Sequence, residues 1–179
     1  MNRTRPWLPR WSQPILALLL LAAPLVTAAP AAALTVDVSC LGTSSIDYSP
    51  GLLLAQQSVH LSEVDSFSPC TSTDPTLTSG IVSSDQTLPL SCLNPLSTGA
   101  GLFTINWNNR QSSTIDATFT VTATGSVITS TASGTIVAGT FTGSTATGVF
   151  TYVQPNLLQC LLPPGVTHQS GAVTLLITH

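Results

Sequence analysis

Few side chains beyond position 33 could take part in chemistry. The histidines are His60, His168 and His179, and the only Lys or Arg in this part is Arg110. A serine hydrolase needs a histidine beside a serine and a carboxylate, and the chain has no G-x-S-x-G motif. His60 or His168 could be the base of a dispersed site, but His60 stands between apolar residues and should face solvent. We therefore predict no catalytic residue.

Two carboxylates, Glu63 and Asp65, share one face of an expected strand because side chains alternate with period two. Glycoside hydrolysis needs its two carboxyl groups ~5–10 Å apart across a cleft, and neighbours on one strand face do not provide this. Together with Asp74 the pair could bind Ca²⁺ through oxygen ligands, although no D-x-D-x-D-G loop is present. There is also no glycine-rich phosphate loop, so we predict no metal and no cofactor.

Four cysteines lie beyond position 33, namely Cys40, Cys70, Cys92 and Cys160. None forms a C-x-x-C pair, so two disulfides are favoured over a metal site, each stabilising by ~2–4 kcal/mol. If residues 35–48 and 57–67 are antiparallel strands, Cys40 comes near Cys70 and leaves Cys92 for Cys160. The alternative joins Cys70 to Cys92 and Cys40 to Cys160.

The first 33 residues are typical of a signal peptide. Three arginines precede an apolar run at 14–26, and small residues follow, with cleavage expected after Ala33. An uncleaved anchor is the weaker alternative, because the run is shorter than the ~20 residues that cross a bilayer. Residues 34–179 are then expected to be secreted as a single domain with no membrane anchor.

The charge of the expected mature chain excludes some partners. Residues 34–179 carry Arg110 against seven carboxylates, which gives a formal charge of −6 without any lysine. Nucleic acids and anionic membranes are bound mainly through Lys and Arg, so both are improbable partners.

Short alternations of apolar and polar residues, rich in β-branched side chains, fill residues 34–179, and turn signals recur every 8–12 residues or so. This pattern predicts an all-β antiparallel domain without helices. We expect a β-sandwich of immunoglobulin-like type, with a closed antiparallel β-barrel as the alternative.

A β-hairpin is predicted around Trp107. A three-residue turn at 108–110 places Phe103 opposite Ile115 and keeps both apolar rows on one face. Its last residue, Arg110, should then have a positive φ. Trp107 could be the floor of a ligand site, but a buried structural side chain is favoured. Its expected core neighbours are Phe119, Val121, Ile136, Phe141 and Phe150.

Several motifs taken together resemble a group of small secreted actinobacterial proteins without an assigned activity. They include Cys40-x-Gly42, the segment Tyr48 to Leu52, Ser68-Pro69-Cys70, Ser91-Cys92, Trp107-Asn108-Asn109, the segment 134–143, Cys160 and Pro164-Gly165. The resemblance implies export, two disulfides and an all-β domain, and it implies no catalytic residue. It also implies glycine at position 110, so Arg110 is a departure.

These observations favour a non-catalytic extracellular binding or interaction module whose partner and oligomeric state the sequence does not specify. One alternative is a barrel that holds a small apolar ligand in an internal cavity. Another is a small hydrolase with a dispersed site. An internal cavity, an exposed patch or a histidine beside a serine would distinguish the three.

Overall fold

The computed structural model describes residues 34–179, and the expected signal peptide at 1–33, cleaved after Ala33, lies outside the described residues. No helix in the described part is long and apolar enough to span a bilayer. The elements are β1 (Val36–Leu52), β2 (Gln57–Ser72), β3 (Gly80–Leu90), β4 (Gly99–Trp107), β5 (Ser112–Thr124), β6 (Val127–Gly139), β7 (Thr145–Val153), the 3-10 helix η1 (Gln159–Leu161) and β8 (Val166–Thr178).

The strands form one closed antiparallel barrel in sequence order, so the expected immunoglobulin-like sandwich is wrong and the alternative, a closed barrel, is confirmed. Closure comes from β1 and β8, which pair from Val36 opposite Thr178 to Leu52 opposite Val166. A sandwich and a barrel bury the same alternating apolar rows. The pairing of the first strand with the last decides between them, and periodicity does not encode it.

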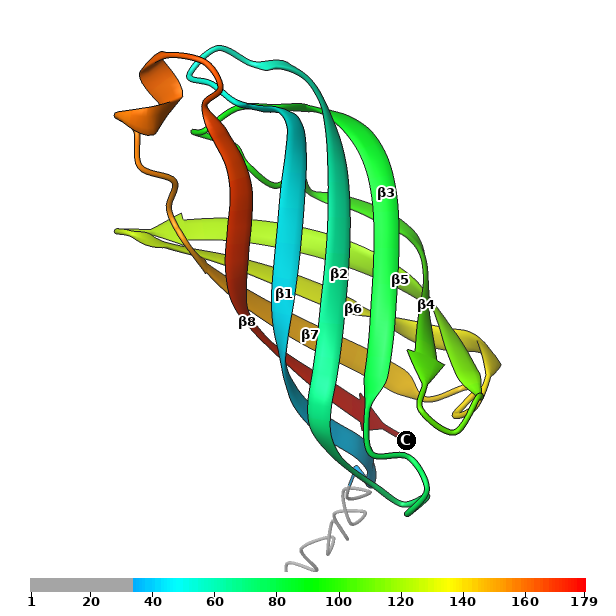
Figure 1. Ribbon diagram of the computed structural model, residues 1–179. Coiled ribbons are helices and arrows are strands. Elements are labelled where there is room, and N and C mark those ends of the chain that lie inside the picture. Colours follow the sequence, from blue (N-terminus) through cyan, green and yellow to red (C-terminus); the bar gives the residue numbers. More distant parts are fainter. Residues whose placement is uncertain (1–33) are drawn as a thin grey trace, which may run out of the picture. The chain divides into compact units, whose positions relative to one another are not determined.

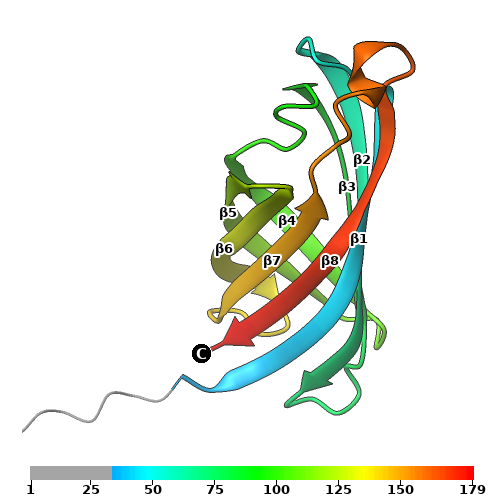
Figure 2. The same cartoon turned by 90° about the vertical axis from the view of Figure 1, so that its left-hand side faces the viewer.

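The barrel has two unlike sides. Strands β1, β2, β3 and β8 run side by side, and β4 to β7 cross behind them in the view of Figure 1 (Figures 1 and 2). Glycines permit close strand approaches. A Cβ at Gly42 would clash with the Ser66 carbonyl oxygen, and one at Gly134 would clash with the Asp116 carbonyl oxygen. Such contacts mark places where only glycine lets the sheet curl.

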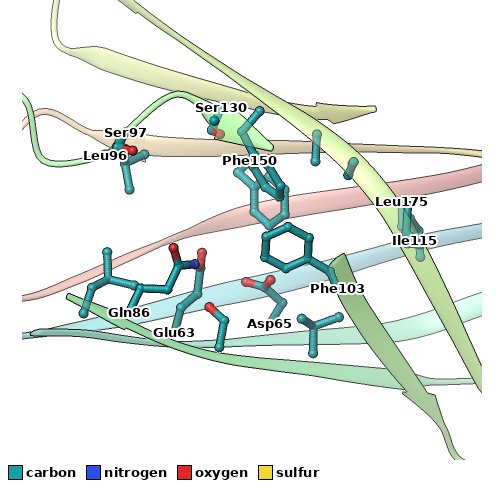
Figure 3. A pocket seen from close by; sticks show the side chains of 18 of the residues that line it. Glu63, Asp65, Gln86, Leu96, Ser97, Phe103, Ile115, Ser130, Phe150 and Leu175 are labelled. Carbon is teal, nitrogen blue, oxygen red and sulfur yellow. The ribbon is translucent and has the colours of Figure 1, made fainter. Parts of the chain in front are cut away.

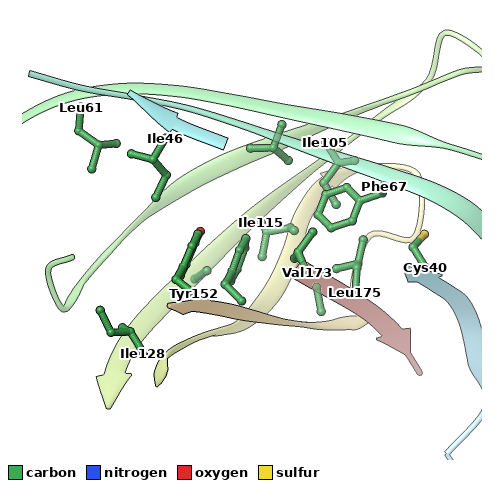
Figure 4. Packing of buried hydrophobic residues seen from close by; sticks show 14 of the residues in the cluster. Cys40, Ile46, Leu61, Phe67, Ile105, Ile115, Ile128, Tyr152, Val173 and Leu175 are labelled. Atoms are coloured by element: carbon green, nitrogen blue, oxygen red, sulfur yellow. The ribbon is translucent and has the colours of Figure 1, made fainter. Parts of the chain in front are cut away.

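The core fills the inside of the barrel. Ile46, Ile105, Ile128 and Val173 are each at most 1% exposed and come from four different strands (Figure 4). Among the expected core residues, Ile136 and Phe150 are buried, and Phe119, Val121 and Phe141 are partly buried against them. Alternation therefore identified the inward rows on the strands, whereas Phe141 lies in the turn after β6, where its φ is +64°.

Both disulfides are present, and they have the pairing that the strand order favoured. Cys40 lies directly opposite Cys70 in the β1–β2 ladder and is bonded to it. Cys92, after β3, is bonded to Cys160 in η1. Two disulfides are typical of proteins that fold in an oxidising compartment.

The hairpin at Trp107 has the predicted register. The Arg110 amide donates to the Trp107 carbonyl at 3.1 Å, and the φ of Arg110 is +68°. The Trp107 side chain is 4% exposed and donates from Nε1 to Ser113 Oγ at 2.9 Å. A Cβ at Gly80 would lie only 2.6 Å from its ring, so the tryptophan covers that glycine. Trp107 is thus a structural side chain that closes one region of the core.

Replacing Arg110 by glycine should stabilise the protein. A positive φ costs a non-glycine residue ~1 kcal/mol or more, and glycine does not pay this cost. The greater conformational freedom of glycine in the unfolded chain offsets part of the stability that the substitution gains. Arg110 is exposed and forms no ion pair with the other described residues, so removing its side chain costs little. Arg110→Gly should raise the melting temperature by ~2 °C, since ~1 kcal/mol corresponds to ~2–4 °C for a domain of this size.

Arg110→Ala is the matched control, because it removes the side chain but keeps the conformational cost. It should leave the melting temperature almost unchanged. A melting temperature for Arg110→Gly at or below that of Arg110→Ala would contradict the assignment of strain to this turn.

Candidate ligand-binding site in the barrel

A cavity of about 150 Å³ lies inside the barrel beside the packed core. Small side chains leave this space: Ala117 on β5, Ala132 on β6, and Ala146 and Gly148 on β7 all line it. Phenylalanine rings form much of the apolar lining, among them Phe103, Phe119 and Phe150. A cavity of this size is roughly large enough for a benzene ring.

The cavity opens where β3 and β4 separate. These strands pair only at Gly80 opposite Trp107 and Ile81 opposite Asn106, although β3 continues to Leu90. Exposed residues near this gap also line the cavity, among them Gln86 on β3 and Ala100 on β4. A second hollow of about 470 Å³ shares Leu96 and Ser97 with the first. The short ladder therefore leaves a route from solvent into the barrel.

Two carboxylates stand on the inner wall of this largely apolar cavity. Glu63 and Asp65 point inward from β2, and Figure 3 shows both facing the rings of Phe103 and Phe150. Asp65 is 4% exposed. Among the described residues, those that line the cavity include no Lys, Arg or His, so no basic side chain of the lining compensates this pair.

Hydrogen bonds hold Glu63 in place. The Tyr152 hydroxyl lies 2.8 Å from Ser44 Oγ and 3.2 Å from Glu63 Oε1, so its proton can serve either acceptor. The Ser44 hydroxyl donates to Glu63 Oε1 at 3.2 Å. Tyr48, on the same strand as Ser44, donates to Gln169 Oε1 at 2.9 Å. Strands β1 and β7 thus fix one oxygen of Glu63.

Other polar groups in the cavity have no partner within the described part of the chain. Asp65 Oδ1 and Ser84 Oγ are both buried without a hydrogen bond. Ser84 lies opposite Glu63 in the β2–β3 ladder, so its hydroxyl faces the same space. Because most buried polar groups have a partner, two such atoms in one cavity indicate a place where a ligand or water can bind.

Burial shifts the acid–base behaviour of the pair. Removal from water raises the pKa of Asp65 to about 7, and the neighbouring Glu63 charge adds to the shift. Burial also raises the pKa of Glu63, while hydrogen bonds from Tyr152 and Ser44 oppose the rise. Burial and then the charge of Glu63 raise the pKa of the hydroxyls of Tyr48 and Tyr152. The pair is therefore poised to hold a proton near neutral pH.

The histidines proposed for a hydrolase lie elsewhere. His60 Nε2 is 3.6 Å from Asp85, and His168 Nδ1 is 2.8 Å from Asp47, all with exposed side chains. Neither ring lines the cavity or is bonded to a serine hydroxyl within residues 34–179. The structure does not bring either histidine together with the serine that such a site requires.

Of the three acidic residues considered for calcium, Asp74 lies apart from the other two. Asp74 lies in the loop after β2, where its side chain accepts hydrogen bonds from Thr76, and it does not line the cavity that holds Glu63 and Asp65. Across the described residues, no three His, Cys, Asp or Glu side chains are grouped as metal ligands.

The sequence contained a signal for the carboxylate pair. Alternation places the apolar neighbours of His60, Val59 and Leu61, inward, and the same period of two places Glu63 and Asp65 inward. Considered only as neighbours on one strand face, the two acids do not indicate a cavity. The other inward side chains of this part of β2 are Val, Leu and Phe. Two acids in such a row indicate a polar site inside the barrel.

No protein-family model, curated protein or solved structure matches the chain, so no family or homologue is identified. The site is therefore interpreted from its own geometry.

Asp65 should make the stability of the protein depend on pH. Its pKa is about 7 in the folded state and ~3.9 when unfolded, so the folded state retains a proton that the unfolded state loses. Stability present at ~pH 4 is then lost progressively up to ~pH 7. The titratable groups that interact with Asp65 are Glu63 and Tyr152, and Tyr48 interacts with Glu63. Both tyrosines stay neutral in this range.

Asp65→Asn removes this penalty while keeping the shape of the side chain. At ~pH 8 the variant should melt ~5 °C or more above the parent protein, and its stability should vary less between ~pH 4 and ~pH 7. Asp116→Asn, on the outer face of β5, is the control and should behave as the parent does. Identical pH profiles for the parent and Asp65→Asn would contradict the burial of an ionisable group at this position.

Proposed function

We propose that this protein is a secreted, non-catalytic binding protein that holds a small, largely apolar organic ligand inside its barrel. The observation that carries the proposal is the internal cavity of about 150 Å³, lined by phenylalanine, alanine and leucine side chains and open at the β3–β4 gap. Concave apolar sites with a few polar groups are the usual form of small-molecule sites.

The placement of small residues supports this function. Ala132 lies opposite Phe119 on β5 and Gly148 on β7, so large and small side chains meet across the sheet. Larger aliphatic side chains at 132 and 148 would fill the cavity, and a cavity in a core costs stability. The small residues leave a cavity that lowers stability and connects to solvent. This arrangement is better explained by ligand binding than by packing of the core.

A second candidate is an extracellular interaction module, and an exposed group of leucines favours it. These residues surround the Cys92–Cys160 disulfide, and the Leu54 amide donates to the Cys160 carbonyl at 3.1 Å. The exposed side chains in this leucine group are Leu54, Leu93, Leu157, Leu158, Leu161 and Leu162. Contiguous exposed apolar side chains often mark interaction sites.

Filling the cavity should weaken binding of an apolar probe. Fluorobenzene should bind the parent protein, seen as a concentration-dependent shift of its fluorine NMR signal. Ala132→Leu adds three carbons within the cavity and should weaken this binding at least ~10-fold, because the probe and the new side chain compete for the same space. Ala172→Leu, on the outside of β8, is the matched control and should bind as the parent does.

Absence of fluorobenzene binding to the parent, or equal binding to both variants, would contradict a ligand site in the cavity. Ala132→Leu also separates the two candidate functions. It should leave any activity of the leucine group unchanged, because that group lies outside the cavity.

A further inference from the structure

The unpartnered atoms of the cavity define what a ligand must bring. Asp65 Oδ1 lacks a hydrogen bond although its side chain is 4% exposed, and Ser84 Oγ lacks one as well. In its ionised form the Asp65 carboxylate can only accept hydrogen bonds, so a ligand that binds this form must provide a donor. Serine can accept a bond from the same donor group. The cavity therefore suits a ligand with several donor hydrogens on one atom.

The register of the strands brings these acceptors together. Glu63 lies opposite Ser84 on β3, and Asp65 follows Glu63 by two residues on the same face of β2. Directly opposed side chains on adjacent strands have their Cβ atoms ~4.5–5.5 Å apart. One compact group placed among the three side chains could therefore contact all of them. A primary ammonium group has three donor hydrogens and the positive charge that two carboxylates require.

The opposite wall suits the organic part of such an ion. The rings of Phe103 and Phe119 have their centroids 4.6 Å apart, and Phe150 lies with them along the cavity. Phe103 and Phe150 face the two carboxylates in Figure 3. Aromatic faces attract cations, and their apolar surface favours hydrocarbon. One wall thus offers anionic acceptors and the other offers aromatic surface.

We infer that the cavity binds a small organic ammonium ion, with its nitrogen against Glu63, Asp65 and Ser84 and its apolar part among the phenylalanines. This inference rests on the proposed function and names its ligand class. A neutral hydrocarbon would fill the same space but leave Asp65 and Ser84 without partners. A neutral alcohol has a single donor hydrogen and no charge for the pair.

Binding of an ammonium ion should release a proton. The pKa of Asp65 is about 7, so the pair retains a proton near neutral pH, and a cation beside it favours the ionised form. The other titratable groups facing the pair are the hydroxyls of Tyr48 and Tyr152, which stay protonated. Affinity for an amine should therefore increase as the pH rises from ~6 to ~8, and affinity for a neutral probe should not.

The experiment compares benzylamine with toluene and benzyl alcohol, three probes with the same ring and different substituents. Binding to the intact protein is measured by titration calorimetry and chemical-shift changes at ~pH 7.5. Benzylamine should bind at least ~10-fold more tightly than either neutral probe. Calorimetry in buffers of different ionisation enthalpy should detect proton release with benzylamine alone.

Asp65→Asn and Glu63→Gln test the anchor without changing the volume of the cavity. Each should weaken benzylamine binding ~10-fold or more and leave toluene binding unchanged, and Asp116→Asn should alter neither. Ser84→Ala is the second test if a carboxylate variant fails to fold. It removes a hydroxyl that has no partner in the free protein, so the fold should tolerate it while benzylamine binding weakens.

Each result has a defined meaning. Preference for benzylamine that these variants remove supports the ammonium site. Equal binding of benzylamine and toluene, or variants that change neither affinity, overturns the ammonium site while the proposed apolar cavity stands. If none of the three probes binds the parent, and fluorobenzene also fails to bind it, the proposed function itself is overturned.

Discussion

The antiparallel ladder between β1 and β8 is the constraint on which the rest of the molecule depends, because it closes the sheet into a barrel with an enclosed interior. Once it forms, every inward row faces every other, and residues far apart in sequence share one space. Tyr152 on β7 can then reach Ser44 on β1, and both can reach Glu63 on β2. Without closure, the same side chains would lie on one face of an open sheet, and no cavity would separate them from water.

Much of this architecture could be predicted from local patterns. Alternation placed Ile136 and Phe150 in the core, the turn residues set the register at Trp107, and antiparallel pairing of the first two strands placed Cys40 beside Cys70. Closure could not be predicted, because it joins the two ends of the described chain and each inward row looks the same in a sandwich. The site was missed for a different reason. Its acids lie on the inward row of β2, but charged residues are usually expected to face solvent.

The carboxylate pair and the apolar cavity depend on each other energetically. Burial makes the ionised pair costly, and the barrel provides no Lys, Arg or His among the described lining residues to compensate it. Protonation, hydrogen bonds from Tyr152 and Ser44, and a bound ligand are the three ways to lower that cost. Buried ionisable groups are common in binding sites. They lower the stability of the folded protein, but they allow it to recognise a ligand.

The short β3–β4 ladder has a consequence for self-association. A closed barrel normally leaves no sheet edge, but here the two strands expose backbone donors and acceptors over most of their length. Such edges are templates for pairing with another chain. The local sequence opposes this, since Asp85 places a charge on β3, Pro89 removes a backbone donor, and Gly99 and Gly101 weaken the strand propensity of β4. These residues thus protect the unpaired edges against association with another chain.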